Sequence, residues 1–316
     1  MLLGIVAVLL ALAGVGLAYM IAMPGRSHSG PLPALTDEEK ALAARLRQHV
    51  EALAGSERND DLETPARYIE GAFAGRGLRP ARHHFQSGGR TVSNIEVSPA
   101  QSPVVVVGAH YDTVPGSPGA NDNASGVAAL LELAGLLGND GLPVRFVAFA
   151  NEEMPYFMGP EMGSWRSAHR SQERGERPRA MLSLEMLGYY DDAPGSQRYP
   201  PPLGLFYPGR ADFIAFVGDL GARALVRQSI QIFRERTAFP SQGIAAPAFI
   251  PGVSWSDHWS FRDHGFPAIM VTDTAFNRYP HYHLPSDTPE KLDYERLARV
   301  TLGLAGVIRE LATENR

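Results

Sequence analysis

The 316-residue sequence predicts an α/β fold of three layers, with helices on both faces of a central, largely parallel mixed sheet, preceded by an N-terminal apolar helix. Two observations carry this prediction. Continuous apolar runs rich in β-branched residues, such as 104–109 and 144–150, are typical of strands buried on both faces. Segments with helical spacing of apolar residues separate these runs, and a repeated β-α order produces a parallel sheet covered by helices.

Residues 1–23 form an apolar segment ahead of the folded domain. A helix of about 20 apolar residues spans the core of a bilayer. No Lys or Arg precedes the run, which favours a retained transmembrane anchor, while a cleaved signal segment remains the alternative. Arg26 is the only strong positive charge nearby, and the positive-inside rule would then place the domain in the cytoplasm.

Residues 24–35 are rich in Pro, Gly and Ser and are expected to form a linker, so the domain comprises residues 36–316. Thr36 and Glu39 form a capping box at the start of its first helix. A second helix is expected to begin at Thr64-Pro65, because Pro is favoured at the first helical position.

The rest of the domain alternates between the two kinds of element. Strands are expected at 94–97, 104–109, 144–150, 181–187 and 268–272, and helices at 127–137, 211–220, 221–229 and 292–311. The Pro-rich stretch 199–208 interrupts this alternation and is expected to be a surface loop that shapes a substrate pocket.

Composition excludes several classes of protein. Cysteine is absent, which excludes disulfides, thiolate zinc sites and a Cys nucleophile. The net charge of −5 offers no basic footprint, so no nucleic-acid partner is expected. Any zinc would therefore be held by His and carboxylate side chains.

Acidic and histidine side chains stand at or just beyond the ends of the expected strands. They are His110, Glu152, Glu153, Glu185 and His283. In an open α/β sheet, ligands bind beyond the carboxyl ends of the strands, so these side chains are expected to meet at one edge. Imidazole and carboxylate donors with one spare acid are the components of a two-zinc hydrolase.

Several of these motifs also have an ordinary structural interpretation. His110 and Asp112 together suggest a metal ligand whose second nitrogen is held by a carboxylate, or simply a loop His beside a surface Asp. Asp122, in a Gly- and Asn-rich turn, is either a carboxylate that bridges two metals or a helix N-cap. Glu152 and Glu153 are adjacent like charges that repel each other unless a cation binds between them. The alternative is that they mark a strand end exposed to solvent.

The remaining candidates differ in strength. Glu185 is flanked by apolar residues, where an unpaired carboxylate is costly, so a metal or an Arg partner is required. His281 and His283 lie two apart, and either is a possible last ligand. Asp257 and His258 are expected to support the ligands, to line the pocket, or to form a structural hydrogen-bonded pair.

In order and spacing, these motifs resemble those of the aminopeptidase Y family of co-catalytic di-zinc exopeptidases, which includes bacterial secreted aminopeptidases. The resemblance covers roughly residues 37–312 and rests on an ordered set of segments. They are His110-Tyr111-Asp112-Thr113, Gly119 to Gly126, Asn151-Glu152-Glu153, Met162-Gly163-Ser164, Ser183-Leu184-Glu185-Met186, Ser256-Asp257-His258 and Tyr282 to Thr288.

The resemblance implies a role for each matched residue. One zinc would be held by His110, Asp122 and His283, and the other by Asp122, Glu153 and Glu185, which gives two Zn²⁺ per chain. Glu152 would be the general base and Tyr282 a donor to the oxyanion. Asp112, Asp287, Asp257 and His258 would support these groups from behind.

The function that follows is that of a zinc metallopeptidase, most simply an aminopeptidase acting on peptide or protein N-termini. The alternatives are a glutaminyl cyclase-like acyltransferase, a carboxypeptidase that would bind the substrate carboxylate through Arg234, Arg236 or Arg278, and a non-catalytic binding domain. The class implies a cell-envelope location, anchored to the membrane through the N-terminal helix or secreted, with the domain outside the cytoplasm. This conflicts with the weak indication from Arg26.

Overall fold

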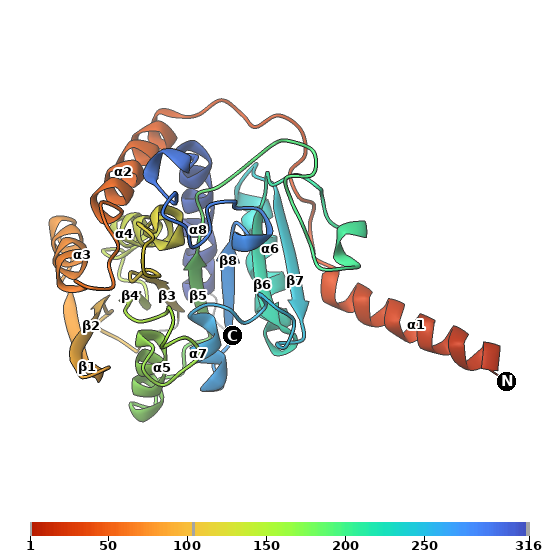
Figure 1. Ribbon diagram of the computed structural model, residues 1–316, viewed down its shortest axis with the longest axis horizontal. Coiled ribbons are helices and arrows are strands. Elements are labelled where there is room, and N and C mark those ends of the chain that lie inside the picture. Colours follow the sequence, from red (N-terminus) through yellow and green to blue (C-terminus); the bar gives the residue numbers. More distant parts are fainter. Residues whose placement is uncertain (1, 103–104, 314–316) are drawn as a thin grey trace.

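An eight-stranded mixed sheet forms the centre of the computed structural model, which describes residues 2–102 and 105–313 (Figure 1). The strands are β1 (Ala81–Ser87), β2 (Arg90–Val97), β3 (Val105–His110), β4 (Val144–Phe149), β5 (Ala180–Glu185), β6 (Ile214–Asp219), β7 (Ser241–Ala246) and β8 (Ala268–Thr272). They lie in the order β1-β2-β4-β3-β5-β8-β6-β7. The central strands β4, β3, β5 and β8 run parallel, while β2 joins β4 and β6 joins β8 in antiparallel fashion.

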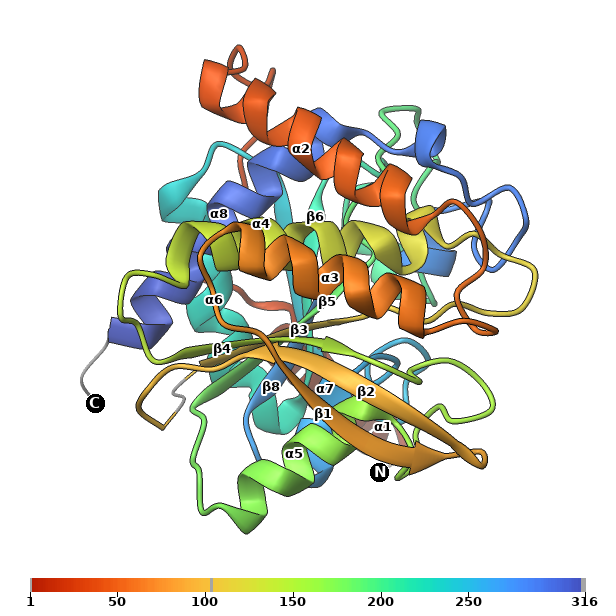
Figure 2. The ribbon, with the colours of Figure 1, turned by 90° about the vertical axis from the view of Figure 1, so that its left-hand side faces the viewer.

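Helices cover the two faces of this sheet unequally. The helices of the domain are α2 (Asp37–Leu53), α3 (Glu63–Gly75), α4 (Gly126–Leu137), α5 (Gly163–Glu173), α6 (Arg223–Arg236), α7 (His258–Asp263) and α8 (Tyr294–Thr313). Helices α3, α4, α6 and α8 contact the strands from one face, with α2 packed over α4 and α8 on the same side, and α5 and α7 pack on the other face (Figure 2). The predicted three-layer α/β class with a mixed sheet is therefore confirmed.

The second face is covered by a helix only in part. Helix α7 contacts β5 and β8, and α5 contacts β2. Beside them, Ala215 and Val217 of β6 and Met270 of β8 pack against Tyr199 and Val253, which lie on loops. In the part of the chain that the structure describes, loops thus cover this face of the sheet over β6 and part of β8.

One predicted element has the wrong type. The sequence predicts a helix at 211–220, but this stretch contains β6. Ile214 and Phe216 face the main core, while Ala215 and Val217 face the loops, so both faces of the strand are apolar. A short run that is apolar on both faces lacks the alternation that separates a strand from a helix.

The N-terminal segment forms helix α1 (Leu2–Ile21), which projects away from the domain beyond the β7 edge (Figure 1). Among the described residues, no helix has the length and apolar character needed to cross a membrane, so the predicted transmembrane anchor is not supported. Residues 24–35, predicted as a linker, contact the domain: the backbone N–H of Ser241 donates to Ser27 Oγ at 2.9 Å. Val104 and residues 314–316, which were assigned to a strand and to the domain, lie outside the described residues.

The apolar stripe of α2 is the face of the helix that packs against the core. Leu42, Leu46, Val50 and Leu53 are all buried against the core that includes α4 and α8. Leu46 is 0% exposed. The stripe therefore fixes the first helix of the domain against α4 and α8.

Replacing Leu46 by Ala is expected to lower the free energy of unfolding by about 2–5 kcal/mol, because it removes buried methyl groups and leaves a cavity. The exposed Leu220, replaced by Ala, serves as the control and is expected to change that energy by less than about 0.5 kcal/mol. Urea denaturation followed by circular dichroism measures both values. Equal destabilisation by the two changes would contradict this account of the core.

Candidate metal centre

The predicted metal ligands converge at the carboxyl edge of the central strands. His110 ends β3, Glu185 ends β5, and Glu152 and Glu153 directly follow β4. Because β4, β3 and β5 are adjacent and parallel, their carboxyl ends lie side by side. Asp122 joins them from a π-helical turn, Ala120–Ser125, that opens into α4.

Asp122 lies between the two histidines. Its Oδ1 lies 3.3 Å from His110 Nε2, and its Oδ2 lies 3.1 Å from His283 Nε2. Glu185 Oε1 approaches His110 Nε2 at 3.5 Å, and Glu153 Oε1 approaches His283 Nε2 at 3.6 Å. Each oxygen of the Asp122 carboxylate thus lies near a different imidazole, and each imidazole is also approached by one further carboxylate.

This donor set fits metal ions. Potential ligand atoms of His110, Asp122 and Glu153 all lie within 4.8 Å of one another, and the three residues are buried. Burial, together with neighbouring acids, raises the pKa of Glu152 and of Glu153 well above the usual range of a glutamate. A cluster of buried carboxylates is stable in the ionised form only if a cation compensates it, and oxygen and imidazole donors suit zinc.

Two aspartates hold the backbone that carries these ligands. Asp112 accepts hydrogen bonds from the backbone N–H groups of Glu152 and Glu153, both at 3.0 Å, and its Oδ1 lies 3.5 Å from His110 Nδ1. Asp287 accepts from the backbone N–H of Asn121 at 2.8 Å and from that of Asp122 at 3.1 Å. Burial raises the pKa of Asp287 to about 6. Both aspartates therefore orient ligand-bearing segments.

Side chains that the sequence analysis left without a role tie the turn of Asp122 to the strand of Glu185. Asn123 Nδ2 donates to the carbonyl of Leu184 at 2.8 Å, and its Oδ1 accepts from the backbone of Met186 at 3.1 Å. Ser256 Oγ donates to Glu185 Oε2 at 2.7 Å. Both residues belong to the quoted motifs, so the signal was present although their partners were not foreseeable.

Arg58 is a buried cation behind the centre that no motif indicated. It is 3% exposed, and its guanidinium donates to the carbonyls of Tyr111 at 2.7 Å and Gly119 at 3.0 Å. Burial lowers its pKa to about 10, against the attraction of Asp112 and Asp122. Arg58 thus fixes the segment between His110 and Asp122 and partly compensates the acids.

The remaining residues predicted for the site are Tyr282, His281, His258 and Asp257. The Tyr282 ring stacks on the His283 ring at 3.7 Å, and burial raises the Tyr282 pKa well above its usual value. His281 is hydrogen-bonded through Nδ1 to Ser286 Oγ at 2.9 Å and is not part of the cluster of possible ligand atoms among the described residues, which comprises His110, Asp122 and Glu153. His258 Nε2 is bonded to the carbonyl of Val253 at 2.8 Å, and burial lowers its pKa to about 4, so it is a neutral structural group. Asp257 is buried beside the ligands, and burial raises its pKa to about 7.

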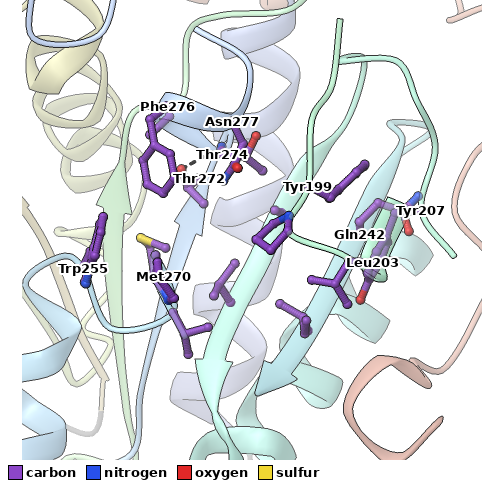
Figure 3. Close-up of a pocket in the computed structure, with 18 of the residues that line it drawn as sticks. Tyr199, Leu203, Tyr207, Gln242, Trp255, Met270, Thr272, Thr274, Phe276 and Asn277 are labelled. Carbon is purple, nitrogen blue, oxygen red and sulfur yellow. Dashed lines mark hydrogen bonds between the residues drawn. The ribbon is translucent and has the colours of Figure 1, made fainter. Parts of the chain in front are cut away.

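A pocket extends from this centre along the loop-covered part of the sheet. Glu185 and Tyr282 line its inner end. Figure 3 shows it extending from Trp255 past Met270 and Thr272 to Leu203 and Tyr207 on the far side. Tyr199, Leu203 and Tyr207 belong to the Pro-rich loop that was predicted to shape a pocket.

The fold and this cluster define a metallopeptidase with its site at the carboxyl edge of an α/β/α sheet. The model of peptidase family M28 matches residues 92–308, and the chain belongs to that family. The predicted resemblance to the aminopeptidase Y group is thereby confirmed.

Curated relatives extend over most of the chain. Protein YfbL of Escherichia coli is 43% identical over 260 residues, which are 78% of this chain and 79% of that protein. A probable leucine aminopeptidase of Arthroderma otae is 27% identical over 261 residues, or 77% of this chain and 63% of its own length.

Solved structures show the same fold. The LapA aminopeptidase of Legionella pneumophila aligns with a TM-score of 0.67 at 19% identity, covering 91% of this chain and 78% of that one. BSAP, a zinc aminopeptidase of Bacillus subtilis, aligns with a TM-score of 0.54 at 25% identity over 72% of this chain and 52% of its own. A glutaminyl cyclase of Bacteroides thetaiotaomicron aligns with a TM-score of 0.63 at 16% identity over 90% and 100% of the two chains.

Replacing Asp112 by Asn is expected to weaken zinc binding by about 10–100-fold, because the amide presents an N–H to one of the two backbone donors of the Glu152 segment. Competition with a chromophoric chelator measures the affinity. The exposed Asp60, changed to Asn, is the matched control. An unchanged affinity in the Asp112 variant would show that the orientation of these two glutamates does not depend on this carboxylate.

Proposed function

We propose that the protein is a zinc-dependent aminopeptidase that removes residues from the free N-termini of peptides. The observation that carries this proposal is the position of Asp122 between His110 and His283, with Glu153 and Glu185 on either side. Membership of a peptidase family and curated aminopeptidase relatives support the same reaction. A location in the cell envelope stays a prediction from the sequence.

Two zinc ions would be held by five side chains. His110, Asp122 and His283 would hold one, and Asp122, Glu153 and Glu185 the other. When bound, zinc lowers the pKa of a water molecule and polarises the carbonyl oxygen of the substrate. The crowding of acids around Asp122 supports a charge of this size at the site.

Glu152 is the proposed general base. It is 5% exposed, and the contact of its backbone with Asp112 fixes the segment that bears it. Burial raises its pKa, which makes its carboxylate a better proton acceptor. It takes the proton of the attacking water and returns it to the nitrogen of the leaving amine.

Tyr282 is the proposed donor to the oxygen that becomes negative during attack. Its hydroxyl is protonated at neutral pH, and burial raises its pKa further from that range. A donor aimed at the developing charge stabilises the transition state more than the bound substrate. The stacked His283 ring restricts the orientation of the tyrosine.

The carboxypeptidase alternative needs a cation for the substrate carboxylate. Arg236 pairs with Glu310, and Arg234 donates to the carbonyl of Ser241 at 2.8 Å. Arg278 is 7% exposed and donates to the carbonyl of Phe213 at 2.9 Å. Among the described residues that line the pocket there is no Arg, Lys or His, which favours a substrate without a charged group there.

The glutaminyl cyclase alternative shares the scaffold, and the structural likeness to one such enzyme, at 16% identity, concerns the fold alone. The number of zinc ions per chain distinguishes the two hypotheses, since a glutaminyl cyclase would hold one ion and the proposed aminopeptidase two. A peptide that begins with Gln would lose water in a cyclase and lose its first residue in an aminopeptidase.

Glu152→Gln is expected to lower kcat by about 100–10,000-fold while the zinc content stays that of the wild type, because the amide cannot accept the proton of the attacking water. Initial rates and metal analysis of the same sample provide the two values. Full activity would remove Glu152 from the role of base, and loss of zinc would make it a ligand instead.

One peptide with a free N-terminus and its N-acetylated twin test the direction of cleavage. We expect stepwise loss of N-terminal residues from the free peptide alone, read by mass spectrometry. A chelator should abolish this loss and added zinc should restore it. Removal of C-terminal residues from both peptides would indicate a carboxypeptidase, and an absence of any change would favour a binding domain.

A further inference from the structure

The pocket beside the metal centre follows one row of residues across four strands. Glu185 pairs with Thr272, Thr272 pairs with Ala215, and Ala215 pairs with Gln242. All four line the same pocket. Three strand spacings separate the ends of the row, which amounts to roughly 14 Å. This is longer than the side chain of any amino acid extends from its Cα.

The walls of this groove are apolar along most of its length. Ala215, Val217 and Met270 form part of its floor. Tyr199 and Leu203 contribute from the Pro-rich loop on the far side from Met270 (Figure 3). Among the described lining residues, the only charged side chain is Glu185, at the metal end. The far part of the groove therefore suits an uncharged group.

Many polar atoms along the groove already have partners within the protein. The Tyr199 hydroxyl donates to the carbonyl of Pro208 and the Tyr207 hydroxyl to that of Gly243, both at 2.7 Å. Gln197 Nε2 donates to Thr274 Oγ1 at 3.0 Å, and its Oε1 accepts from Arg278 Nε at 2.8 Å. Few side-chain partners therefore remain along the groove for the N–H and C=O groups of a peptide backbone, whereas a hydrocarbon chain needs none.

The order of the strands determines which half of a substrate enters the groove. Glu152 follows β4, on one side of β3 and β5, and the groove crosses β8, β6 and β7 on the other side. Glu152 gives its proton to the leaving amine, so the amine half lies toward β4. The acyl half of the scissile amide then points into the groove.

We propose that the protein hydrolyses amides formed between long-chain carboxylic acids and amino acids, with the acyl chain lying in this groove. Water adds to the acyl carbon, the C–N bond breaks, the water oxygen remains in the carboxylic acid and its proton passes to the amino acid nitrogen. The proposal rests on the amide hydrolysis proposed above, but not on a free α-amine in the substrate.

A series of N-acylated leucines tests the proposal on the full chain loaded with zinc. The acyl groups are acetyl, hexanoyl and decanoyl, used below their micelle-forming concentrations, and released leucine is measured by mass spectrometry. We expect kcat/KM to rise by about threefold to fourfold for each added methylene until the groove is filled. Calorimetric titration with butyric, hexanoic and decanoic acids should show the same trend in Kd.

Ala215→Phe is expected to remove most of the gain with chain length, in both rate and binding, because Ala215 lies in the middle of the row. Leu203→Trp fills the groove from the loop and serves if the strand variant does not fold. Leu205 is on the same loop but does not line the pocket and is 82% exposed, so Leu205→Ala should keep the wild-type profile.

The outcomes separate this proposal from the aminopeptidase assignment. Two outcomes, each combined with normal cleavage of free peptides, would overturn the groove proposal alone. In the first, kcat/KM for the N-acylated leucines does not depend on the length of the acyl chain. In the second, the N-acylated leucines are not cleaved at all. Cleavage of decanoyl-leucine without cleavage of free peptides would support it and overturn the aminopeptidase. Release of tri- or tetrapeptides from the N-termini of longer peptides at comparable rates would mean that the groove holds peptide, which also overturns the proposal. No hydrolysis of any substrate by the zinc-loaded protein would overturn both.

Discussion

The mutual repulsion of buried carboxylates is the constraint on which the site depends. Asp122, Glu152, Glu153 and Glu185 are each at most 7% exposed and lie around His110. In a medium of low polarity such a group is stable only with cations and fixed hydrogen-bond donors. Arg58 supplies one cation from behind, and backbone N–H groups are directed at Asp112 and Asp287. The scaffold thus holds the acids apart in the geometry that metal ions would complete.

The sheet meets this constraint by placing the ligands on adjacent parallel strands. Carboxyl ends of β4, β3 and β5 carry Glu152, Glu153, His110 and Glu185, and the loops of Asp122 and His283 close over them. The same sheet continues through β8, β6 and β7 under a roof of loops. One sheet therefore has two parts: its central strands carry the candidate metal ligands, and its outer strands form the floor of the adjacent pocket.

The candidate site residues lie together at strand ends as the sequence predicted, whereas elements toward the sheet edges were not predicted correctly. The strand at 268–272 was predicted with the bounds that it has, because a single apolar run stands between turn residues. Strand β6 was not, because both of its faces are apolar. The hairpin of β1 and β2 was not predicted, although the sequence contains a hairpin signal. Gly88 and Gly89, both at positive φ, form its two-residue turn. Arg58 left no signal, since its partners beside the site, the carbonyls of Tyr111 and Gly119, are distant in the sequence.

The same contrast explains where selectivity can change within this scaffold. The ligand residues are constrained by several partners at once, as when Asn123 joins the carbonyl of Leu184 to the turn of Asp122. The Pro-rich loop has fewer such ties: Leu205 and Phe206 at its tip are exposed, while Tyr199 and Tyr207 are held by one hydroxyl bond each to a carbonyl. Substitutions in this loop can alter the length and width of the groove without disturbing the acids. In the proposed function, the reaction chemistry depends on the central strands and the choice of substrate on the outer strands and this loop, so the two can change separately.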